Sequence, residues 1–129
     1  MQTYLAVAAG VAFLTGVAHS VLGEMLIFRQ LRRGTLVPGQ DAPPLRSRNI
    51  RIIWATWHVA TLFGWAFAGV LLQLALSPQA SLVSLFLNAT VAAYAGGSLL
   101  VLVGTRGRHP GWIALAAVAA LVWTGGGTA

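Results

Sequence analysis

The chain has 129 residues, of which 57% are hydrophobic and only 8% are charged. Soluble domains carry about 25% charged residues, so this composition excludes an ordinary water-facing surface and makes lipid the solvent for much of the chain. The net charge of +6 comes from eight arginines against two acidic residues; because the arginines lie between apolar segments, we expect contacts with the lipid bilayer and no nucleic-acid binding.

The first apolar segment, residues 3–28, predicts a membrane-spanning helix. At about 1.5 Å per residue it is long enough to cross the hydrocarbon core with some tilt. No basic residue precedes it, and this favours a membrane span over a cleaved signal peptide. The basic loop that follows contains Pro38, Pro43 and Pro44, which are typical helix breakers.

Three further apolar segments predict three more spans, over residues 50–76, 81–103 and 110–124. The last is short for a full crossing, and the glycines at 125–127 predict a flexible tail. The expected fold is therefore all-α: a polytopic integral membrane protein with a single membrane domain over residues 1–129. We expect a four-transmembrane-helix bundle made of two helical hairpins, with a short fourth span.

The arginines predict the orientation of the chain. Six lie in or beside the loop at residues 29–51 and two lie at residues 104–111, whereas the second connection and both ends have none. Under the positive-inside rule, both basic loops are cytoplasmic and both termini lie outside, in a multi-pass protein of the plasma (inner) membrane. The residues expected at lipid headgroups are Arg29, Arg32, Arg33, Arg46, Arg48, Arg51, Arg106 and Arg108.

Ionisable residues within a span are costly, so each one calls for a reason. Glu24 is the only acid in an expected span, and pairing with a nearby arginine at the interface would explain it. His19 and His58 are expected at matching depth because adjacent spans run antiparallel. Each lies on a seam of residues spaced three or four apart along its helix, which favours a position between helices over exposure to lipid. In the first span the other members of the seam are small residues, which let two helices approach closely: Ala9, Ala12, Gly16 and Gly23.

Other polar residues extend this candidate site. Thr61 lies one turn after His58 and is expected to orient its ring. His109 could complete a polar rim on the same side of the membrane, although an exposed loop position near headgroups is the favoured interpretation. His19 and Glu24 are about 140° apart around the helix axis, so we expect Glu24 to face a different neighbour, such as the fourth span.

The sequence is compatible with four functional hypotheses. The first is a polar site of His19, Glu24 and His58 that handles protons, a metal ion or a small solute, since imidazole can carry protons and bind metals. The second is a structural or accessory subunit, as a homo-oligomer or beside a larger membrane partner, in which the histidines only pack helices. The third is a redox protein with haem b between His19 and His58, and the fourth is an enzyme acting on lipid or quinone.

Several kinds of chemistry lack support in the sequence. Cysteine is absent, which excludes disulfides and thiolate sites. No HExxH, P-loop or GxSxG motif is present to indicate zinc, nucleotide or serine hydrolysis. His19 and His58 are therefore the candidate ligands for any metal ion, and the cofactor itself is left open.

Overall fold

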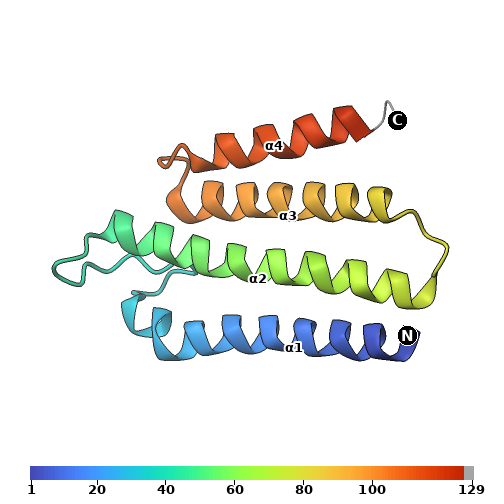
Figure 1. The fold of residues 1–129 in the computed structure, drawn as a ribbon. Coiled ribbons are helices and arrows are strands. Elements are labelled where there is room, and N and C mark those ends of the chain that lie inside the picture. Colours follow the sequence, from blue (N-terminus) through green and yellow to red (C-terminus); the bar gives the residue numbers. More distant parts are fainter. Residues whose placement is uncertain (127–129) are drawn as a thin grey trace.

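The computed structural model describes residues 1–126 and is all-helical (Figure 1). Its elements are α1 (Gln2–Leu26), the 3₁₀ turn η1 (Phe28–Leu31), α2 (Ser47–Leu76), α3 (Leu82–Thr105) and α4 (Gly111–Gly126). Three helices, α1, α2 and α3, are long and apolar enough to cross a membrane. With 16 residues, α4 is shorter than the roughly 20 residues that a full crossing takes.

The helix bounds agree with the expected spans to within three residues. The largest difference is at the start of α2, which begins at Ser47 and so includes Arg48 and Arg51 in its first turns. Near the C-terminus, Gly125 and Gly126 belong to α4, so the prediction of a flexible tail is wrong for these two residues. Gly127, the third glycine of that prediction, lies outside the described residues. Gly126 lies close to Leu87 of α3, so packing between helices offsets the low helix propensity of glycine.

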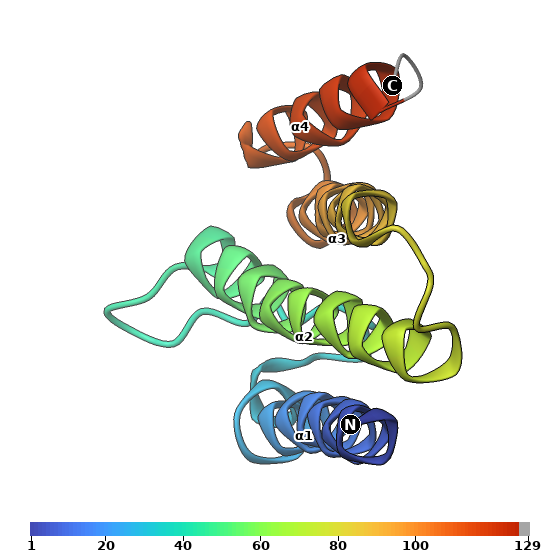
Figure 2. The ribbon, with the colours of Figure 1, turned by 45° about the vertical axis from the view of Figure 1, so that its right-hand side comes forward.

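The helices form a single row in chain order (Figures 1 and 2). Within residues 1–126, extensive helix–helix contacts join α1 to α2, α2 to α3 and α3 to α4. Figure 2 shows α1 and α4 at opposite edges of this row. The all-α prediction is confirmed, whereas the four-helix bundle is not, because the edge helices do not come together to close a common core.

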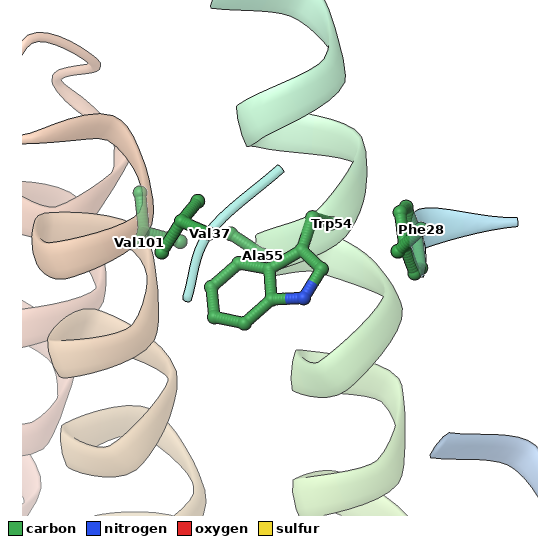
Figure 3. Packing of buried hydrophobic residues seen from close by; sticks show 5 residues of the cluster. All are labelled: Phe28, Val37, Trp54, Ala55 and Val101. Carbon is green, nitrogen blue, oxygen red and sulfur yellow. The ribbon is translucent and has the colours of Figure 1, made fainter. Parts of the chain in front are cut away.

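A buried apolar cluster lies where the first loop, which joins η1 to α2 over residues 32–46, folds back onto the helices (Figure 3). Val37 of that loop lies between Val101 of α3 and the side chains of Trp54 and Ala55 on α2, and Phe28 lies on the far side of the indole. Phe28 is only 1% exposed. The loop is therefore a packed part of the fold, and it fixes the loop end of α1, α2 and α3 relative to one another.

This packing predicts a large effect of Phe28→Ala. Removing the Phe28 ring should lower the free energy of unfolding by about 3–5 kcal/mol, because the loss of a buried ring leaves a cavity behind. Thermal unfolding of the detergent-solubilised protein, followed by tryptophan fluorescence, measures the change. Leu26→Ala is the control, since Leu26 is 65% exposed; equal losses in the two variants would contradict the packing described here.

Candidate functional site

Three indole N–H groups of α2 donate hydrogen bonds across the interface to α1. The bonds run from Trp65 Nε1 to the Phe13 carbonyl (3.1 Å), from Trp57 Nε1 to the His19 carbonyl (3.0 Å) and from Trp54 Nε1 to Glu24 Oε1 (2.6 Å). Indole nitrogens in apolar surroundings need such acceptors. The three bonds together set the position of α1 along α2.

Glycines on α1 make room for two of these indoles. A Cβ atom on Gly16 would overlap the indole of Trp65, and a Cβ atom on Gly23 would overlap that of Trp57. Both glycines are buried. The expectation that the small-residue seam of the first span faces a neighbouring helix is therefore confirmed, and the neighbour is α2.

Glu24 lies at the centre of a group of hydrogen-bond donors. Its Oε1 accepts from Trp54 Nε1 (2.6 Å) and from His58 Nε2 (3.0 Å), and its Oε2 pairs with Nη2 of Arg32, directly after η1. These donors offset the cost of a carboxylate in apolar surroundings. Pairing with a nearby arginine was one of the sequence interpretations, and Arg32 makes that contact. The expectation that Glu24 faces the fourth span is wrong, because its partners come from α2 and the chain after η1.

The second ring nitrogen of His58, Nδ1, continues the line of hydrogen bonds along the interface between α1 and α2. Ser20 Oγ lies 2.9 Å from His58 Nδ1 and 2.9 Å from Thr61 Oγ1. Thr61 is 4% exposed. Glu24, His58, Ser20 and Thr61 thus form an unbroken line of hydrogen-bonded groups, called the α1–α2 relay below. Thr61 acts on the His58 ring through Ser20 and not by the direct contact that the sequence suggested.

His19 lies beside the relay without joining it. Its ring stacks on Trp57, with centroids 4.3 Å apart and planes inclined by 8°, and its Nε2 is buried without a hydrogen-bond partner. Trp57 directly precedes His58, so the two histidines lie at a similar level of the interface. Within residues 1–126, the ring contacts and side-chain hydrogen bonds of the two histidines involve different groups, and none joins the two imidazoles.

This arrangement lends no support to His19 and His58 as a pair of metal or haem ligands. Both ring nitrogens of His58 are engaged, one with Glu24 and one with Ser20. Within residues 1–126, no three His, Asp or Glu side chains come together in a way that could hold a metal ion. The chemistry that the geometry offers is proton exchange along hydrogen bonds.

The remaining candidate, His109, lies elsewhere. Its Nδ1 accepts from the Gly111 N–H (3.1 Å), and its side chain lines a cavity among loop arginines. Two residues of this site were not among the predicted site residues: Ser20, which belongs to the relay, and Trp54, which donates to Glu24. Helical spacing could have indicated them, since Ser20 lies four residues before Glu24 and Trp54 four before His58, which places each pair on one helix face.

The close approach of α1 and α2 predicts that Gly23→Ala is destabilising. The added methyl would displace the Trp57 indole, and overpacking of this kind costs about 1–3 kcal/mol. Gly10→Ala on the same helix is the matched control, because a Cβ atom there meets nothing within 4 Å. Thermal unfolding in detergent should separate the variants, and a Gly23→Ala protein as stable as Gly10→Ala would refute this helix contact.

Comparison with known proteins adds no family to this description. The chain matches no protein-family model, no curated protein and no solved structure. The candidate site is therefore defined by its geometry alone: a carboxylate, an imidazole and two hydroxyls joined in line across one helix pair.

Proposed function

We propose that this chain is a small multi-pass membrane protein that carries protons through the α1–α2 relay. The observation that carries the proposal is the unbroken hydrogen-bonded line from Glu24 through His58 and Ser20 to Thr61. Each of these groups can exchange a proton or reorient a hydroxyl. A metal ion or a small solute, the other cargoes considered from the sequence, has less support because the same bonds occupy both nitrogens of His58.

The relay has two hydrogen-bonding states that share one set of heavy-atom positions. While Glu24 is ionised it can only accept, so His58 Nε2 carries a proton in both states. In the first state Ser20 donates to Nδ1 and Thr61 donates to Ser20. A proton that arrives at the Thr61 hydroxyl converts this state to the second: the Ser20 proton moves to Nδ1 and the Thr61 proton moves to Ser20, so Nδ1 now donates to Ser20 and Ser20 donates to Thr61. The imidazolium then passes its Nε2 proton to the Glu24 carboxylate. Hydroxyl rotation reverses the bonds, and Trp54 and Arg32 hold the carboxylate in place throughout.

The proposal includes four spans in the plasma (inner) membrane, with both basic loops cytoplasmic and both termini outside. In its favour, residues of the two basic loops line one cavity and so lie at the same end of the row. The N-terminus and the end of α4 lie at the opposite end (Figure 1). The 16 residues of α4 rise about 24 Å, a mismatch that local bilayer thinning can accommodate.

A structural or accessory subunit is the second candidate function. Two observations favour it: Glu24 already has donors on both oxygens, and among residues 1–126 no helix packs extensively on the outer faces of α1 and α4. Leu14 on α1 and Leu121 on α4 are 65% and 72% exposed. In this role the relay only fastens α1 to α2, and the edge helices contact lipid, a second copy or a larger membrane partner.

Proton flux distinguishes the two candidates. In vesicles enclosing a pH-sensitive dye, Ser20→Ala should lower the flux by about a hundredfold or more, because it separates His58 from Thr61 and removes a positioned proton carrier. Thr56→Ala is the control on α2, since its hydroxyl bonds only to carbonyls of its own helix. If wild-type vesicles conduct no better than empty ones, the relay is a structural device.

The tautomer of His58 offers a second measurement. The carboxylate of Glu24 should hold the neutral imidazole in the form protonated at Nε2, because an ionised carboxylate accepts and never donates. Nitrogen NMR of histidine-labelled protein reads this directly, since the chain has only three histidines. Glu24→Gln should weaken the preference; an Nδ1-protonated form in the wild-type protein would contradict the bonding pattern.

A further inference from the structure

A cavity of about 910 Å³ lies at the loop end of the row, away from the relay. It is lined by the first loop, the start of α2 and the connection between α3 and α4. Its size falls within the range of small-molecule sites, about 300–1,000 Å³. The basic residues in its lining are Arg46, Arg48, Arg51, Arg106, Arg108 and His109.

The walls of this cavity are held by specific contacts. Arg51 Nη1 donates to the Gly104 carbonyl at 3.3 Å, which ties α2 to the end of α3. The first loop is folded back by the N–H groups of Gly39 and Gln40, which both donate to the Leu31 carbonyl at 3.0 and 3.1 Å. The cavity is therefore a product of the fold and not a gap between free loops.

The positive charge in the cavity is poorly compensated. Asp41 is the only acid in its lining, and that carboxylate already accepts from the backbone N–H of Ser47. Arg51 lines the same cavity as Arg106 and Arg108, so like charges from separate segments face one space and repel one another. The α2 N-terminus also opens here with no acidic residue in its first turn, so the helix dipole adds further positive potential. An anion with several acceptor oxygens would relieve this repulsion.

We propose that this cavity binds a phosphate group, carried either by an anionic phospholipid headgroup or by a free phosphate compound. The planar guanidinium fork binds two phosphate oxygens at once, which suits a cavity with five arginines from the first loop, the start of α2 and the connection between α3 and α4. The proposal is independent of the α1–α2 relay, since no relay residue lines the cavity. Proton transport and phosphate binding can therefore fail separately.

The test uses the full chain, purified in a non-ionic detergent. Native mass spectrometry measures retention of dioleoylphosphatidylglycerol and, for comparison, dioleoylphosphatidylcholine, and calorimetry measures binding of inorganic phosphate. The variant Arg48→Gln/Arg108→Gln removes one arginine from each wall. The variant Arg29→Gln/Arg33→Gln is the matched control, because it removes the same charge from positions outside the cavity.

We expect the cavity variant to bind the phosphate probe at least about tenfold more weakly than wild type, as expected from the loss of charge-assisted bonds. The control variant should bind as wild type does. Retention of phosphatidylglycerol without binding of inorganic phosphate identifies a lipid site, whereas binding of inorganic phosphate that displaces the lipid identifies a site for free phosphate compounds. Either result supports the proposal.

Two results would overturn it: equal weakening in the two double variants, or a wild-type protein that binds neither probe. Helix content by circular dichroism checks that each variant is folded. If the cavity double variant is not folded, the single variant Arg108→Gln replaces it and Arg33→Gln becomes the control. Equal weakening in these two single variants would then overturn the proposal.

Discussion

A carboxylate in apolar surroundings must be enclosed by donors, and the arrangement of α1 and α2 follows from this requirement at Glu24. One donor, Trp54, belongs to the buried cluster at the loop end, and another, His58, leads into the interface. The third, Arg32, directly follows η1, and its ion pair with Glu24 holds the start of the loop against α1. A single acidic side chain thus fixes the register of two helices and the start of the loop between them.

The tryptophans of α2 extend the same register along the interface. Each indole N–H has an acceptor on α1, and the glycines opposite two of the rings let the helix backbones approach. Lipid supplies no hydrophobic drive for helix association, so close packing and hydrogen bonds are the available sources of stability. The α1–α2 pair uses both, which explains why a site can exist on one helix pair in an open row.

The first turns of α2 connect the two polar features of the molecule. Arg51 lines the arginine-rich cavity and donates to the end of α3, and Trp54, one turn later, donates to Glu24. Gly104 of α3 lies close to both Trp54 and Ala55, so α3 supports this turn from the opposite side. α2 therefore provides residues to the relay and the cavity alike, while α4 contacts only α3 extensively within residues 1–126.

Hydropathy and helical spacing were sufficient to predict the helices, the gathering of arginine in and beside two connections and the small-residue seam of α1, because these are properties of the chain read along its length. The sequence also indicated Glu24 and His58 as polar groups needing partners. Three features are seen only in the folded chain: Ser20 bridges His58 and Thr61, His19 stacks on Trp57, and the helices lie in a row. The rotation of a helix about its axis and its lateral neighbours depend on contacts between distant segments, and the local pattern of residues does not specify them.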